Sequence, residues 1–159
     1  MEKNNPIHSP IRVNKAYAAG ILADVKGFKN LKPDWFASYT FRYGVKDEEA
    51  IAEFRNYCIR VARQTGSHIL PVYSLGRIAG SAPHIHAVLC SERHLTYRDV
   101  HIWRSGTSEQ KLYDPSKPGI EYLCDYSRSH KFVIGVSPYC PRKGSCRRRG
   151  CVFQRGRER

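Results

Sequence analysis

The chain has 159 residues, and its 27 Lys and Arg residues exceed its 14 Asp and Glu residues to give a net charge of +13. This length suits one domain with its own core, and a domain this basic typically binds a polyanion such as nucleic acid. No apolar run approaches the roughly 18 to 20 residues that span a bilayer, and the N-terminus lacks signal-peptide features. We therefore expect no membrane partner and a cytoplasmic protein, or a nuclear one in a eukaryotic cell.

The N-terminal third is predicted to contain an arm, a strand and a helix. Residues 1–33 have no sustained hydrophobic period and form the arm, with a short helix over 16–25. The aromatic and β-branched stretch 35–43 predicts a strand. Apolar residues then recur at helical spacing over 47–66, and Asp47 is the expected N-terminal cap.

The middle of the chain is predicted to form a hairpin. A second strand covers 68–74, where Pro71 has no N–H to donate and favours an edge position or a bulge. The turn-rich residues 76–81 connect it to a third strand over 83–90.

The remaining elements alternate between helices and strands. Thr96 can cap a short helix over 96–103, and a strand follows over 109–113. A helix is predicted over 118–126 and a last strand over 131–136. The pattern predicts an α+β domain in which helices flank an antiparallel sheet of about five strands.

Residues 138–159 form a basic C-terminal tail. Its eight Lys and Arg residues stand against one Glu and supply more than half of the net charge. We expect the tail to be disordered when free and to attach to phosphates without reading sequence. The candidate phosphate contacts in it are Arg147, Arg148 and Arg149.

The six cysteines fall into two groups. One group lies in apolar segments and is predicted to be buried: Cys58, Cys90 and Cys124. The other lies in or next to the basic tail: Cys140, Cys146 and Cys151. These three, with His130, are candidates for a structural Zn²⁺ site, although they lack the paired C-x-x-C spacing, and free thiols are the alternative.

His84 and His86 stand one residue apart at the start of an apolar run. On a strand their side chains share one face, while Ile85, Ala87 and Leu89 share the other. Imidazole is the commonest side-chain metal ligand, so the pair can hold a divalent cation if a third group joins it. The alternative is a chance match to a short motif.

Three segments in this order resemble the HUH endonucleases, most closely the rolling-circle replication initiators of small plasmids and viruses. The first is the strand that ends in Thr40-Phe41, the second is the histidine pair, and the third is the helix around Tyr122. The resemblance spans about residues 35–135 and implies an HUH nuclease fold of the ferredoxin-like or RRM-like kind over 34–137.

The resemblance also implies a chemistry. His84 and His86 would hold Mg²⁺ or Mn²⁺, and Tyr122 would attack a DNA phosphate to give a 5′-phosphotyrosine and a free 3′-hydroxyl. The partner would be single-stranded or hairpin origin DNA, with Arg42 among its contacts. The chain has no G-x-x-x-x-G-K-[ST] loop, so any helicase would be a host or separate protein.

Two departures from the initiators concern the metal. Ser74 stands where related proteins carry a carboxylate, and Asp125 stands where they carry a lysine. We expect Asp125, on the same helix face as Tyr122, to supply the missing oxygen ligand. His68, Gln64 and water are the other candidates. Tyr126 lies one turn from Tyr122 and is an alternative or second nucleophile.

Two other functions fit the same residues. A single-strand transposase would use the same chemistry and would suit a metal ligand on the helix. A non-enzymatic single-stranded nucleic-acid binding module would leave the histidines structural. The aromatic side chains at Trp35, Tyr39, Tyr43 and Trp103 would stack on bases if they face the DNA groove, whereas core packing is the ordinary role for most of them.

Overall fold

The computed structural model describes most of the chain between residues 30 and 123 and some residues outside it. The described residues are 20, 23, 30–42, 44–76, 82–117, 119–120, 122–123, 134–136 and 139. The elements in chain order are β1 (Lys32–Thr40), α2 (Asp47–Thr65), β2 (Ile69–Gly76), β3 (His84–Ser91), α3 (Tyr97–Val100), β4 (Ser108–Leu112) and β5 (Ile134–Val136).

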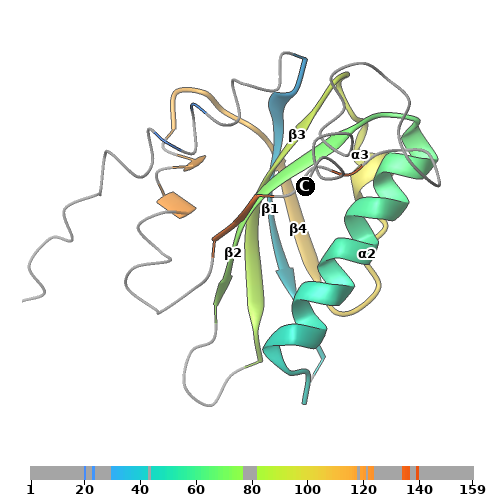
Figure 1. The fold of residues 1–159 in the computed structure, drawn as a ribbon, viewed down its shortest axis with the longest axis vertical. Helices are drawn as coiled ribbons and strands as arrows, with labels where there is room; N and C mark the ends of the chain where they lie inside the picture. The colour runs from blue at the N-terminus through green and yellow to red at the C-terminus, as the bar shows by residue number, and fades with distance from the viewer. Residues whose placement is uncertain are drawn as a thin grey trace, which may run out of the picture.

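The strands form one antiparallel sheet in the order β4-β1-β3-β2-β5 (Figure 1). α2 lies along one face of this sheet, and the helical residues 119–120 and 122–123 lie on the other side. The predicted α+β class, with helices on an antiparallel sheet, is therefore confirmed. Within the described part of the chain, no helix is long and apolar enough to cross a membrane.

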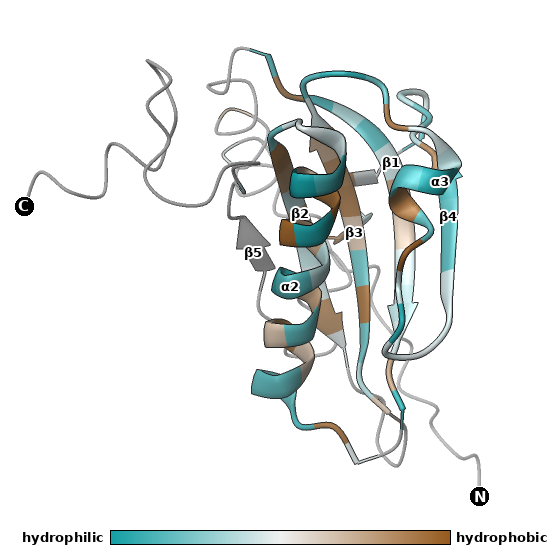
Figure 2. Cartoon of the chain, turned by 90° about the vertical axis from the view of Figure 1, so that its right-hand side faces the viewer, coloured by the Kyte–Doolittle hydropathy of each residue, from teal (hydrophilic) through white to brown (hydrophobic). Residues whose placement is uncertain are grey.

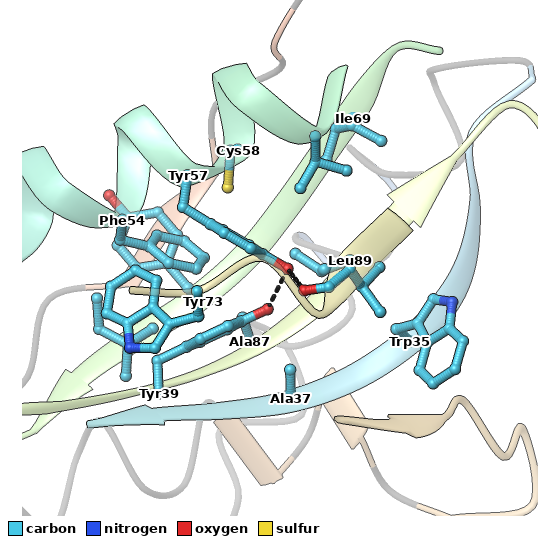
Figure 3. Close-up of a cluster of buried hydrophobic side chains, with 14 of the residues drawn as sticks. Trp35, Ala37, Tyr39, Phe54, Tyr57, Cys58, Ile69, Tyr73, Ala87 and Leu89 are labelled. Atoms are coloured by element: carbon cyan, nitrogen blue, oxygen red, sulfur yellow. Dashed lines mark hydrogen bonds between the residues drawn. The ribbon is translucent and has the colours of Figure 1, made fainter. Parts of the chain in front are cut away.

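The larger core lies between α2 and the sheet (Figures 2 and 3). α2 buries one stripe at helical spacing: Ala50, Phe54, Tyr57, Cys58, Val61 and Ala62. Alternate residues of β1 and β3 meet this stripe, because successive strand side chains point to opposite faces. They include Ala37, Tyr39, Ile85, Ala87 and Leu89. Trp35, Tyr39 and Trp103 belong to this core, which confirms packing rather than base stacking as their role, whereas Tyr43 lies outside the described residues.

A second, smaller core covers the opposite face of the sheet. Leu70, Val72, Val88 and Cys90 point from β2 and β3 toward Ile120 and Leu123. Burial, and secondarily the charge of Asp34, raises the pKa of Cys90 to about 12. Cys58 and Cys90 are thus buried as predicted, whereas Cys124 lies outside the described residues.

Several boundaries differ from those predicted. β1 begins at Lys32, inside the predicted arm, and of the expected 16–25 helix only Gly20 and Ala23 are described, both helical. Lys46, not Asp47, is the N-cap of α2, because the Glu49 carboxylate accepts the Lys46 N–H at 3.0 Å.

The other differences concern β2 and α3. β2 lies between β3 and β5, so the edge position predicted from Pro71 is wrong. The pairs between β2 and β5 cover Val72–Ser74 and leave out the proline, which has no N–H to donate. α3 ends at Val100, three residues before the predicted end, although the expected Thr96 cap is present.

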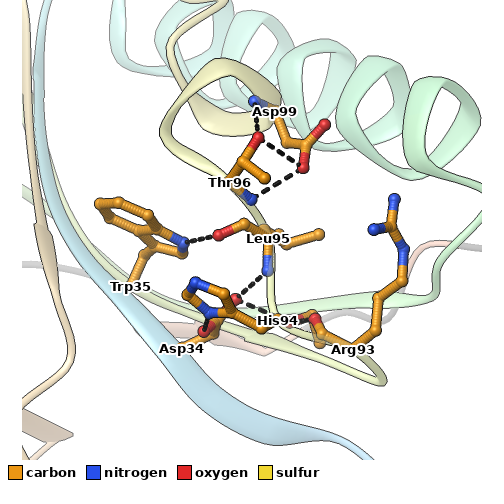
Figure 4. A network of polar contacts seen from close by, with 8 residues as sticks. Asp34, Trp35, Arg93, His94, Leu95, Thr96 and Asp99 are labelled. Carbon is orange, nitrogen blue, oxygen red and sulfur yellow. Dashed lines mark hydrogen bonds and ion pairs between the residues drawn. The ribbon is translucent and has the colours of Figure 1, made fainter.

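A polar network joins the start of β1 to the loop after β3 (Figure 4). The register of β1 against β3 shifts at Asp34, which stands between Pro33 and Trp35. The Asp34 carboxylate accepts the Leu95 N–H at 2.7 Å and lies 2.7 Å from His94 Nδ1. This network holds the chain as it leaves the sheet toward α3 and β4.

Candidate active site

The histidine pair lies on β3, which has β1 on one side and β2 on the other. The two side chains share one face, as predicted. This face is the one opposite α2, because Ile85 and Ala87 enter the core with α2. The two imidazole rings have centroids 5.3 Å apart and are inclined at 78°. The central strand of the sheet therefore presents two imidazoles side by side.

Ser38 orients the ring of His86. It lies directly opposite His86 on β1, and its Oγ is 2.8 Å from His86 Nδ1. When Nδ1 carries the proton and donates it to this oxygen, Nε2 carries the lone pair that a metal binds. Burial, and secondarily the charge of His84, lowers the pKa of His86 to about 4. His86 is therefore neutral near pH 7, the state in which imidazole can be a ligand.

Tyr122 lies beside His86, although the two residues are 36 positions apart in the sequence. The fully buried side chains of Ile120 and Leu123 hold this helical stretch on the sheet. Tyr122 lies between them in sequence and keeps 42% of its surface exposed. Its ring centroid is 6.0 Å from that of His86 and 6.1 Å from that of Phe36, each in an edge-to-face arrangement.

A pocket of about 380 Å³ opens beside His86 and Tyr122. Its walls come from β1, β3, β4, the turn after β4 and the helical residues Gly119 and Tyr122. Phe36 and Tyr113 provide aromatic surface, and Lys111 and Lys117 provide positive charge. The volume is within the range of about 300 to 1,000 Å³ that small-molecule sites occupy.

The described residues supply two of the three expected metal ligands. The described part of the chain contains no cluster of three or more His, Cys, Asp or Glu side chains that could hold a metal ion without further ligands. Asp125, the predicted third ligand, lies outside the described residues, as does the rival nucleophile Tyr126. Two imidazoles fit part of the coordination shell of a divalent cation, with water or substrate phosphate among the oxygens that complete such shells.

Two of the alternative ligands are wrong. His68 precedes Ile69, which pairs with Ser91 on β3. Ser91 is five positions from His86 on the same strand, so at ~3.3 Å per residue His68 lies roughly 17 Å from His86. It pairs instead with Glu92, at 3.0 Å between Nδ1 and Oε1. Gln64 belongs to α2, on the other face of the sheet.

Ser74 lies directly opposite His86 on β2, and it is fully buried. Its Oγ has no hydrogen-bond partner among the described residues. The position at which the resemblance implies a carboxylate is thus next to His86, but here it presents a covered hydroxyl.

Of the other predicted site residues, Arg42 is described by the structure and those in the tail are not. Arg42 is exposed just beyond β1, whose last residue Thr40 pairs with His84. The tail residues proposed for phosphate or zinc binding lie outside the described residues: Arg147, Arg148, Arg149, Cys140, Cys146 and Cys151.

Sequence reasoning missed Ser38, Phe36 and the two pocket lysines. Alternation along β1 places Phe36 and Ser38 on one face, but only the pairing register shows that Ser38 meets His86. Lys111 and Lys117 belong to no sequence motif that would mark them as functional.

Comparisons of the chain with protein-family models, with curated proteins and with solved structures found no match.

Proposed function

We propose that the chain is a metal-dependent single-stranded DNA nickase and strand transferase of the HUH type that initiates rolling-circle replication. The observation that carries the proposal is the contact of Tyr122 with His86, at 6.0 Å between ring centroids. A half-exposed tyrosine beside His86, which is neutral, held by Ser38 and next to His84, supports a nucleophile beside a cation site. The central position of β3 supports the finer proposal of an HUH nuclease fold.

The proposed reaction exchanges one phosphoester for another. The Tyr122 oxygen forms a bond to the scissile phosphorus, and the bond from phosphorus to O3′ breaks. The tyrosine proton passes to solvent, and the departing 3′ oxygen takes up a proton. The product is a 5′-phosphotyrosine and a free 3′-hydroxyl, and the reverse reaction rejoins the strand.

The residues of the chain have separate roles in this proposal. His84 and His86 hold Mg²⁺ or Mn²⁺, which when bound stabilises the charge that develops on the phosphate oxygens. Ser38 keeps His86 in position, and the neutrality of His86 above about pH 4 preserves its lone pair. The net charge of +13 attracts DNA.

The test is a covalent-adduct assay with the full chain, Mn²⁺ and a pool of random single-stranded DNA, read on a denaturing gel. DNA labelled at its 3′ end should become attached to the protein, whereas DNA labelled at its 5′ end should be released. The adduct should form with Tyr126→Phe, be lost with Tyr122→Phe and be lost when EDTA removes the metal.

An adduct that persists in Tyr122→Phe would assign the nucleophile elsewhere. Failure to form any adduct, also with hairpin and single-stranded DNA from the replicon that encodes the chain, would overturn the nuclease. Metal-independent DNA binding in that case would establish the binding module.

A further inference from the structure

We propose that the pocket beside Tyr122 holds the base of the nucleotide next to the scissile phosphate, while Lys111 and Lys117 contact the DNA backbone there. This inference rests on the proposed function, because it assigns the substrate position for that reaction. His86 and Tyr122 themselves line the pocket, so a nucleotide in it lies directly beside the reacting groups.

The aromatic walls suit a nucleobase. Phe36 lies nearly parallel to His86, with 24° between the ring planes and 6.5 Å between centroids, and it meets Tyr122 edge to face. Tyr113 adds a second aromatic side chain at the rim. Bases stack on such rings with little regard to sequence, which is the usual means of holding single strands.

Gly119 shapes the pocket through its contact with Tyr113. A Cβ placed on Gly119 would lie 2.6 Å from Tyr113 Cε2, so the tyrosine ring occupies the space that any other residue needs. The Tyr113 backbone cannot easily retreat, because its N–H donates to Asp34 O at 2.9 Å. A side chain at position 119 must therefore turn the ring of Tyr113, and the wall of the pocket moves with it.

The two lysines can exchange their present partners for phosphate. Lys111 Nζ lies 2.7 Å from Glu109 Oε1, and Lys117 Nζ lies 3.4 Å from Asp114 Oδ2. Exposed ion pairs of this kind are weak and are readily screened by salt. The Asp114 carboxylate is also occupied within its own turn, where Oδ1 accepts from Ser116 Oγ at 2.6 Å. The pocket, which Asp114 also lines, thus combines aromatic surface with two lysines that can turn to a nucleotide phosphate.

The experiment separates this pocket from catalysis by using Tyr122→Phe protein without metal. Random single-stranded 12-mers carrying 5-bromodeoxyuridine are cross-linked to it by light, and the modified peptides are identified by mass spectrometry. The expected cross-links are to Phe36 or Tyr113.

Affinity for the same 12-mers is measured by fluorescence anisotropy at several salt concentrations. Gly119→Ala should weaken binding several-fold. Replacing both lysines by Ala should lower the slope of log K against log salt by about 0.7 for each phosphate that a lysine no longer neutralises. Replacing both Arg60 and Arg63 by Ala, which removes two exposed charges from α2 at the opposite face, is the matched control for the lysine pair and should bind more tightly than either variant.

Cross-links confined to other surfaces, or equal binding by all variants and the control, would overturn the pocket. Cross-links in the pocket without any covalent adduct in the nickase assay would retain the pocket and reject the nuclease. An adduct through Tyr122 with cross-links elsewhere would retain the nuclease and reject the pocket.

Discussion

Lowering the pH from 7 toward 4 should destabilise the folded chain through His86, and His86→Gln should isolate that effect. Burial first, and then the charge of His84, lowers the pKa of His86 from 6.5 to about 4. Because the unfolded chain takes up the proton at a higher pH than the folded chain, His86 leaves stability intact above about pH 6.5 and reduces it progressively down to about pH 4.

The size of this effect follows from the pKa difference. At about 1.4 kcal/mol per pH unit, the change from 6.5 to about 4 corresponds to roughly 3 kcal/mol. The ring is half-buried, so screening by water reduces the expected loss to about 1.5 kcal/mol.

The assay is urea unfolding at a series of pH values, followed by the fluorescence of the buried Trp35 and Trp103. Between pH 6.5 and 4 the free energy of unfolding should fall by about 1.5 kcal/mol more in the original chain than in His86→Gln. His84→Gln should raise the pKa of His86 only part of the way, because burial is the larger cause. Parallel curves for the original chain and His86→Gln, or an NMR titration of His86 near 6.5, would refute the reasoning.

Three further variants test individual contacts. Ser38→Ala should lower Mn²⁺ affinity roughly 10- to 100-fold, measured by electron paramagnetic resonance, because His86 loses the hydroxyl that orients it; an unchanged affinity would contradict this role. Gly106→Ala should unfold at clearly lower urea, since its Cβ would overlap the carbonyl oxygen of Thr40 in β1, and a native midpoint would show that the loop can move. Tyr57→Phe should cost about 1 to 3 kcal/mol in urea unfolding, because the buried Tyr39 hydroxyl loses its acceptor at 2.9 Å; no loss would mean that another acceptor replaces it.

Local pattern was sufficient for much of the fold. The alternation around His84 and His86 predicted their common face, and the helical spacing of apolar residues predicted α2. These predictions succeeded because each element buries one side, and its periodicity records which side that is. The predicted boundaries of the elements were less accurate. Lys46 is not a typical N-cap residue, and it caps α2 because its backbone N–H donates to the carboxylate of Glu49.

Pairing between distant segments required the tertiary structure. No local pattern relates Ser38 to His86, because their contact follows from the register of β1 against β3. The place of Tyr122 depends on Ile120 and Leu123, which bury their side chains against β2 and β3. The resemblance implied by analogy that the tyrosine and the histidines share one site. The contact of Tyr122 with His86 results from the packing of Ile120 and Leu123 on the sheet.

The sequence by itself determined which side chains share a face, the strong positive charge and the candidate chemistry of two imidazoles and a tyrosine. Only the tertiary structure decided that His86 is half-buried beside Ser38, that Tyr122 lies above it and that Lys111 and Lys117 line the same pocket. The physical reason is that periodicity is a property of neighbouring residues. The register between strands and the packing of a helix on a sheet depend instead on how much apolar surface segments far apart in the chain bury together.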